Sequence, residues 1–232
     1  MSGADPAVAP ADEPALCRRA RGLSGRTIAE VARELGRALP HAPGRAKGYV
    51  GTLVEAALGA SAGNRSEPDF PALGVELKTV PMSAAGVPRE STFVCSIALD
   101  RVADAEWAES AVARKLERVL FIPVESERGV AFEARRFGAP LLWSPAPAQR
   151  ARLRADWEML ADLVGRGELD RVTAHLGVAL QIRPKAAHSR VVRLGPGEDG
   201  SVWTLPRGFY LRRTFTASVF ATAAGGASGM GR

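Results

Sequence analysis

The sequence predicts a mixed α/β fold, built either as one large domain or as two lobes that flank a cleft. The chain has 232 residues, of which 46% are hydrophobic, and this is enough to bury a sizeable core. Apolar stripes of helical spacing alternate along the chain with short β-branched runs, and this alternation is typical of mixed α/β proteins. We find no internal repeat that would indicate a solenoid.

The first third of the chain predicts two helices. A helix over 28–39 has apolar residues on one face, with Ser24 or Thr27 as its cap and Pro40 as its end. A basic, glycine-containing loop follows, and then a second helix over 49–58 that stops at a glycine.

The elements that follow are mostly strands. We expect strands near 74–80, 92–99 and 119–124, with a helix over 108–118 between the last two. A longer helix is expected over about 148–165. The remaining expectations are a strand over 178–183 and a strand that continues into a helix over 207–220.

Composition indicates a cytoplasmic protein with unstructured ends. Residues 1–15 are rich in Ala and Pro, and 221–232 in Gly, Ala and Ser, so both are expected to form disordered tails around a single domain of two lobes, 16–220. The two cysteines, Cys17 and Cys95, are too few for a disulfide framework. No apolar stretch of about 18 residues suggests a membrane segment, and we expect a monomer without membrane association.

The net charge of +6 and a pI near 10 favour a polyanionic partner such as DNA. Similar charge is also found in proteins that never touch nucleic acid. The balance therefore permits DNA binding without proving it.

The strongest chemical signal is an acidic residue, Asp69, followed seven positions later by the triplet Glu76-Leu-Lys78. On a strand, Glu76 and Lys78 point to the same face, and a turn containing Pro71 and Gly74 can fold Asp69 back beside them. Carboxylate oxygens suit Mg²⁺, which can activate water against a phosphodiester while the lysine orients that water. The pattern predicts a metal-dependent phosphodiesterase, although a strand with a charged solvent face would look the same.

Lysine usage gives the motif more weight. Only four of the 31 basic residues are lysines, and all others are arginines. Where lysine persists, the chemistry can require a compact ammonium that a planar guanidinium cannot imitate. The alternative, that the four lysines are codon remnants, stays open; they are Lys47, Lys78, Lys115 and Lys185.

Several blocks of sequence together resemble the MutH family of DNA mismatch repair endonucleases, in register from about Gly44 to Val219. The blocks are Lys47-Gly-Tyr-Val-Gly, Leu58-Gly-Ala-Ser-Ala-Gly63, Asp69-Phe, Ala72-Leu-Gly-Val-Glu-Leu-Lys-Thr79, Thr92-Phe-Val-Cys95, Leu141-Leu-Trp-Ser-Pro145, Gln181-Ile-Arg-Pro-Lys-Ala-Ala187 and Thr204-Leu-Pro-Arg-Gly-Phe-Tyr210. The resemblance implies a restriction-endonuclease-like fold, a mixed sheet flanked by helices in two lobes around a DNA cleft. It also implies Mg²⁺-dependent nicking of the unmethylated strand at hemimethylated GATC sites, activated by MutL and indirectly by MutS.

The resemblance assigns catalytic roles to five residues. Asp69 and Glu76 match the family's metal ligands, and Lys78 matches the residue beside the attacking water. Glu55 matches an additional acidic residue near the site, although it could also be an ordinary exposed helix glutamate. Lys115 matches a basic residue that reaches the active site, and the alternative is a solvated helix face.

The resemblance assigns DNA binding to Lys47, Gly48, Arg183, Lys185 and Tyr210. Arg183 and Lys185 share a strand face and can donate to guanine N7 and O6, or they contact only phosphates. Tyr210 is expected to sense the adenine N6-methyl group, whereas without the resemblance it would be assigned to core packing.

Two features depart from the family pattern. They are the segment 188–202, with its Gly-Pro-Gly-Glu-Asp-Gly turn, and the Gly/Ala-rich end in place of a more apolar terminal helix. Both bear on regulation rather than on chemistry.

Two other functions stay open, a stand-alone type II restriction nuclease that cuts both strands and a non-catalytic DNA-binding module.

Overall fold

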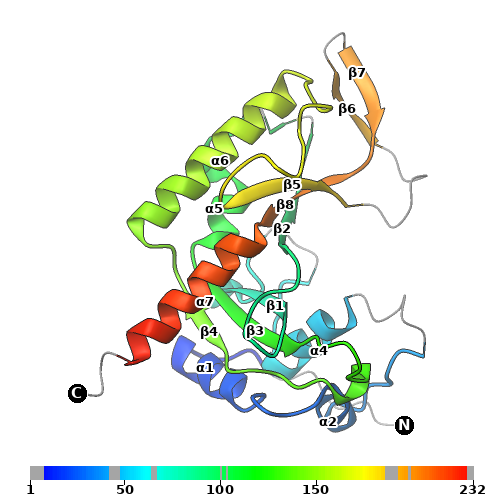
Figure 1. Cartoon of the computed structure of the whole chain (residues 1–232), viewed down its shortest axis with the longest axis vertical. Helices are drawn as coiled ribbons and strands as arrows, with labels where there is room; N and C mark the ends of the chain where they lie inside the picture. Colours follow the sequence, from blue (N-terminus) through cyan, green and yellow to red (C-terminus); the bar gives the residue numbers. More distant parts are fainter. Residues whose placement is uncertain are drawn as a thin grey trace. The chain divides into compact units, whose positions relative to one another are not determined.

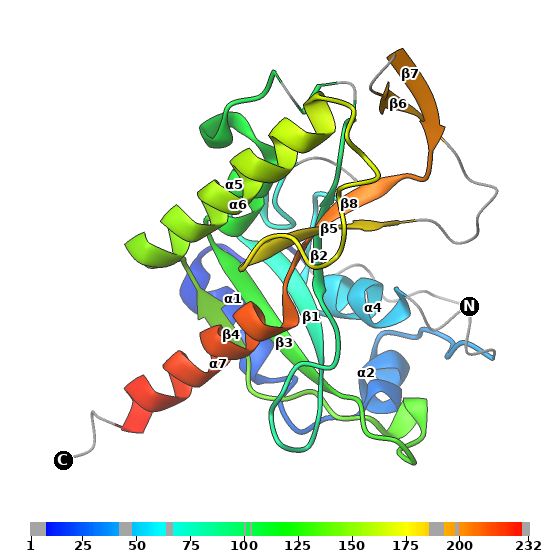
Figure 2. The same cartoon turned by 45° about the horizontal axis from the view of Figure 1, so that its top comes forward.

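The structure, a computed structural model, describes residues 8–41, 48–63, 67–99, 101–102, 104–185, 193–197 and 200–228. The chain divides into two compact units (Figures 1 and 2). Unit 1 contains Met1–Glu90 and Glu117–Ser144, and unit 2 contains Ser91–Leu116 and Pro145–Arg232. Among the helices described, none has the length and apolar character needed to cross a bilayer.

Unit 1 is built on a mixed three-stranded sheet in the order β1-β3-β4. Strand β1 (Glu76–Met82) runs parallel to β3 (Val119–Glu125), and β4 (Leu141–Trp143) pairs antiparallel with β3. The register places Glu76 opposite Val119 and Lys78 opposite Phe121. The predicted motif therefore lies on the edge strand β1, and the predicted mixed α/β class is confirmed.

Three helices cover one face of this sheet: α1 (Glu13–Arg21), α2 (Ile28–Glu34) and α4 (Tyr49–Leu58). Figure 1 shows α4 alongside β1, and α4 also contacts α1 and α2. The shared core includes Leu16, Val31, Leu53, Leu77 and Ile122, all buried. Burial of these side chains fixes the position of α4 relative to β1. The candidate site lies where these two elements meet.

Two boundaries in unit 1 differ from expectation. Residues 13–15, expected in a disordered tail, begin helix α1, because Asp12 caps it by accepting the N–H of Ala15 at 2.7 Å. The first helix expected, 28–39, ends at Glu34, because Gly36 adopts a left-handed conformation that only glycine tolerates easily. The predicted cap Thr27 forms a capping box with Glu30.

Unit 2 contains an antiparallel sheet in the order β2-β8-β5. Its strands are β2 (Thr92–Ser96), β8 (Arg207–Leu211) and β5 (Leu180–Pro184). Helix α6 (Pro147–Gly165) contacts β5, and the short helix α5 (Ala111–Leu116) contacts β2. Figure 2 shows the hairpin of β6 (Arg193–Gly197) and β7 (Gly200–Thr204) leading into β8; it occupies much of the segment that departs from the family pattern.

Helix α7 (Arg213–Ser228) follows β8 and extends well into the expected tail over 221–232. Alanine has the highest helix propensity, so a helix already nucleated in the packed segment around Phe215 continues through Ala-rich sequence. The expected strand 92–99 ends earlier, at Ser96, after a register shift between Phe93 and Cys95.

Candidate functional site

The turn before β1 folds Asp69 back onto the strand. Phe70 and Val75 pair as an antiparallel bridge, and Gly74 between them has φ +64°, a left-handed conformation that suits glycine. The Asp69 carboxylate accepts the backbone N–H of Leu77 at 2.8 Å. This bond holds the carboxylate at the start of β1, as the turn residues predict.

Glu76 and Lys78 form an ion pair on one face of β1. The Lys78 Nζ lies 2.6 Å from Glu76 Oε1, and the two side chains are only 15% and 2% exposed. Strand alternation explains the shared face, since residues two apart point the same way. The alternative, that Glu76 and Lys78 form a charged face exposed to solvent, is therefore wrong.

Glu55 on α4 provides a third carboxylate near the other two. Burial raises its pKa above the ordinary value of 4.5; the charges of Asp69 and Glu76 raise it further, and Lys78 opposes them. These interactions place Glu55 within electrostatic reach of all three residues. The alternative of an ordinary exposed glutamate is wrong, because Glu55 is half-buried.

We call Glu55, Asp69, Glu76 and Lys78 the carboxylate–lysine cluster. It combines three carboxylates with one ammonium, so negative charge exceeds positive charge. Over the residues described, no three Asp, Glu, His or Cys side chains are gathered closely enough to bind a metal by themselves. Mg²⁺ often uses only one or two carboxylates and completes its shell with water and substrate phosphate, so the cluster fits that ion.

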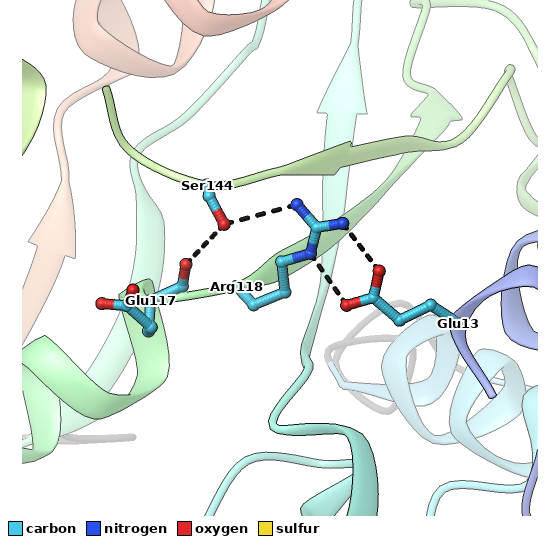
Figure 3. A network of polar contacts seen from close by, with 4 residues as sticks. All are labelled: Glu13, Glu117, Arg118 and Ser144. Carbon is cyan, nitrogen blue, oxygen red and sulfur yellow. Dashed lines mark hydrogen bonds and ion pairs between the residues drawn. The ribbon is translucent and has the colours of Figure 1, made fainter. Parts of the chain in front are cut away.

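A second polar network holds the end of β3 that pairs with Glu76 (Figure 3). The Arg118 carbonyl accepts the N–H of Glu76 at 2.9 Å. Its guanidinium binds both carboxylate oxygens of Glu13, at 2.9 and 2.7 Å, and donates to Ser144 at 3.4 Å. Ser144 in turn donates to the carbonyl of Glu117 at 2.7 Å. The ion pair with Arg118 lowers the pKa of Glu13. The network connects α1 to the start of β3, the strand that pairs with β1.

In unit 2, one face of the β2-β8-β5 sheet carries three of the residues expected to bind DNA. Tyr210 lies opposite Phe93 on β2 and Gln181 on β5, while Arg183 lies opposite Gly208. Cross-strand partners share a face, and Lys185 follows Arg183 at the spacing that keeps that face. Arg183 and Lys185 are exposed and Tyr210 is half-buried, and the role of Tyr210 in DNA binding stays a prediction.

Phe93 organises this face, and sequence reasoning did not find it. Its ring lies under the Lys185 ammonium, with Nζ 3.8 Å from the centroid, and meets the Tyr210 ring edge-on at 5.3 Å. Lys185 Nζ also donates to Ser96 at 3.2 Å. A Cβ at Gly208 would come within 2.8 Å of the Phe93 ring, so this glycine makes room for the ring.

The other expected site residues lie in separate places. Lys115 lies on α5 in unit 2 and is only 8% exposed, so the alternative of a solvated helix face is wrong. Gly48 caps the N-terminus of α4 in a left-handed conformation, with φ +85°. Lys47 lies outside the described residues. The functional roles of these three residues stay predictions.

The fold is mixed α/β, and the restriction-endonuclease-like class is that of the family whose model and relatives match this chain. The family model for the DNA mismatch repair enzyme MutH matches residues 58–156. The DNA mismatch repair protein MutH of Yersinia enterocolitica is 49% identical over 217 residues, which cover 93% of this chain and 95% of that protein. That of Serratia proteamaculans is 48% identical over 213 residues, covering 91% and 93%. The chain therefore belongs to the MutH family of DNA mismatch repair enzymes, as the sequence blocks predicted.

Proposed function

We propose that this protein is a Mg²⁺-dependent endonuclease that nicks the unmethylated strand of hemimethylated GATC sites during mismatch repair. One observation carries the proposal: Asp69, Glu76 and Lys78 lie together at the start of β1, within electrostatic reach of Glu55, whose pKa is raised first by burial and then by the charges of Asp69 and Glu76. Such an excess of negative charge favours binding of a divalent cation. Family membership supports DNA as the substrate.

Asp69 and Glu76 would hold the metal ion. When bound, Mg²⁺ would act as a Lewis acid on the scissile phosphate and would lower the pKa of a coordinated water. The bond from Leu77 N–H orients the Asp69 carboxylate, and the ion pair with Lys78 orients that of Glu76. Glu55 would hold a water or a second ion next to them.

Lys78 would orient the attacking water and stabilise the negative charge that develops on the phosphate. An ammonium suits this role because it is a compact charge with rotatable donors, whereas guanidinium is broad and planar. Its ion pair with Glu76 holds the ammonium on the face of β1 that bears both residues. By the family resemblance, Lys115 would bind a phosphate of the DNA substrate.

The β2-β8-β5 face would read the DNA sequence. Arg183 and Lys185 are exposed on it and can donate to guanine N7 and O6, while contacts to phosphates alone would position the protein without specifying sequence. Tyr210 would sense the adenine N6-methyl group from the same face. Phe93, below Lys185 and beside Tyr210, would hold both in place.

Family membership supports the proposed partners. MutL, recruited by MutS at a mismatch, would activate the enzyme, and the protein would act as a cytoplasmic monomer on chromosomal DNA. Gly48, the N-cap of α4, would contact the DNA backbone, since a helix N-terminus attracts phosphate. Lys47, the residue before it in sequence, would contact the backbone through its charge.

A strand-specific nicking assay tests the proposal. Duplexes carrying one GATC site, either hemimethylated, unmethylated or fully methylated, are incubated with Mg²⁺, with and without MutL. The proposal predicts weak cleavage alone, strong stimulation by MutL and cuts only in the unmethylated strand. Efficient double-strand cleavage without MutL would instead support a type II restriction nuclease, and no cleavage under any activation would support a non-catalytic DNA-binding module.

A further inference from the structure

The residue Asp156 is a buried carboxylate in the middle of helix α6 and belongs to neither site described above. It is only 7% exposed. Burying a carboxylate is costly unless it receives strong hydrogen bonds, and aspartate is a poor helix former. We therefore expect the contacts of Asp156 to stabilise a particular part of unit 2.

Three consecutive backbone amides donate to a single oxygen of this carboxylate. The N–H groups of Val178, Ala179 and Leu180 lie 2.9, 2.6 and 2.8 Å from Asp156 Oδ2. Gly177 precedes them with φ +79°, and a Cβ there would come within 1.9 Å of the Leu180 carbonyl oxygen. The chain thus wraps tightly around the carboxylate just before β5 begins.

Arg212 holds the same loop from the carbonyl side. Its backbone N–H donates to the Ala179 carbonyl at 2.8 Å, and its guanidinium donates to the carbonyls of Ala174 and Leu176 at 3.0 and 3.2 Å. Arg212 directly follows β8, the strand that carries Tyr210. The loop before β5 is therefore fixed by two side chains that are distant in the sequence, Asp156 and Arg212.

This anchoring matters because β5 is an edge strand in the order β2-β8-β5, paired only with β8 in the part of the chain that is described. A shift of one residue in an edge strand would turn every side chain to the opposite face. Leu180 is the first residue of β5, and Arg183 and Lys185 lie three and five positions further along. Fixing Leu180 therefore decides the face on which these basic side chains appear.

We propose that Asp156 is a positioning residue for DNA recognition, which sets the register and direction of β5 so that Arg183 and Lys185 face the DNA. The inference rests on the proposed function, because it assumes that the β2-β8-β5 face reads DNA. It predicts that changes at Asp156 affect substrate binding and sequence preference more than the chemical step.

The test compares Asp156→Asn with Asp162→Asn, a matched change on the same helix at an exposed aspartate that pairs with Arg166. Nicking of hemimethylated GATC duplex in the presence of MutL gives kcat and KM, and a duplex with one base changed in the site gives sequence preference. For Asp156→Asn we expect KM to rise about tenfold or more, the preference for GATC to fall, and kcat to change little, as for a displaced positioning group. Asp162→Asn should behave as the wild type.

Hydrogen exchange of the backbone amides gives a readout that does not depend on activity. Exchange over 178–185 should become faster in Asp156→Asn and stay unchanged in Asp162→Asn. If Asp156→Asn does not fold, Arg212→Gln serves as the second variant, with the same rise in KM expected.

Unchanged exchange over 178–185, a normal KM and sequence preference, or a loss of kcat alone would overturn the proposal. A wild type that does not nick hemimethylated GATC DNA even with MutL would overturn the proposed function and this inference together. Normal nicking by both the wild type and the variants would overturn the inference alone.

Discussion

Replacing Lys78 by methionine removes the cation from the carboxylate–lysine cluster while keeping most of the side-chain volume. Lys78 lies 2.6 Å from Glu76, whose side chain is 2% exposed, and it also counters the charges around Glu55. The variant therefore leaves a buried carboxylate without its closest cation. We expect a loss of both stability and activity.

The size of the stability loss follows from the geometry. At an effective dielectric constant of about 20, unit charges at the 2.6 Å separation of this pair attract by about 6 kcal/mol. Desolvation of both groups offsets much of this in the intact pair, but removing one partner leaves the other desolvated, and this costs about 3–5 kcal/mol. In a chain of this length, that corresponds to a decrease in Tm of roughly 6–20 °C.

The assay is thermal and urea unfolding of four proteins: wild type, Lys78→Met, Glu76→Gln and the double variant. Because the double variant has no unpaired buried charge at this position, it should be more stable than Lys78→Met. Arg154→Met is the control, since it breaks an exposed pair with Glu158 and should change stability by about 0.5 kcal/mol or less. A Lys78→Met variant as stable as the wild type, or a double variant no more stable than Lys78→Met, would refute the reasoning.

Three further predictions concern the metal, the pH response and the DNA-binding face. Mg²⁺ should raise the Tm of the wild type by mass action, chelation should reverse the rise, and Asp69→Asn should abolish it, as followed by thermal denaturation. Because the folded-state pKa of Glu55 is raised, its carboxyl stays protonated in the folded protein where the unfolded chain has already ionised. The stability gained by Glu55→Gln over wild type should therefore be largest above that raised pKa, shrink as the pH falls through it, and disappear below 4.5 in unfolding titrations. Gly208→Ala would place a Cβ 2.8 Å from the Phe93 ring and 3.0 Å from the Cys95 carbonyl, so it should cost about 1–3 kcal/mol and raise KM more than it lowers kcat.

Each of these predictions has a result that contradicts it. An equal rise in Tm with Mg²⁺ in Asp69→Asn would show that the ion binds elsewhere. A Glu55→Gln difference that does not vary between acid and neutral pH would contradict the charge interactions assigned to Glu55. Wild-type KM in Gly208→Ala would show that the position of the Phe93 ring does not matter for DNA binding.

The arrangement of Asp69, Glu76 and Lys78 could be predicted from sequence because its geometry is local. Strand alternation brings Glu76 and Lys78 to one face, and the turn with Gly74 returns Asp69 within eight residues. Helix α4 was predicted to the residue, because Gly59 marks its end clearly.

The parts that sequence reasoning missed depend on contacts between distant residues. The role of Glu13 appears only when α1 packs beside Arg118, which lies 105 positions away. In the sequence, Phe93 is an ordinary aromatic residue of a strand. Only the pairing of β2, β8 and β5 brings Tyr210 and Lys185 to the same face. No local sequence pattern predicts such contacts between distant residues.

The disordered tails predicted from composition were too long at both ends of the chain. A low content of large apolar residues suggested a tail over 1–15, yet Asp12 already caps α1. The Gly/Ala-rich end was likewise assigned to a tail, although α7 continues to Ser228. In both places a helix supported by packing at one end extended into sequence that would not fold alone.

The central claim is that the carboxylate–lysine cluster cleaves DNA with Mg²⁺, and Glu76→Gln tests it most directly. The variant keeps the shape of the side chain and removes one charged oxygen ligand. Nicking of a hemimethylated GATC duplex is measured with Mg²⁺ and MutL, alongside DNA binding in the absence of cleavage. The account predicts that Glu76→Gln binds DNA like the wild type but nicks it about a thousandfold more slowly or worse. Wild-type nicking by Glu76→Gln would contradict the assignment of the site.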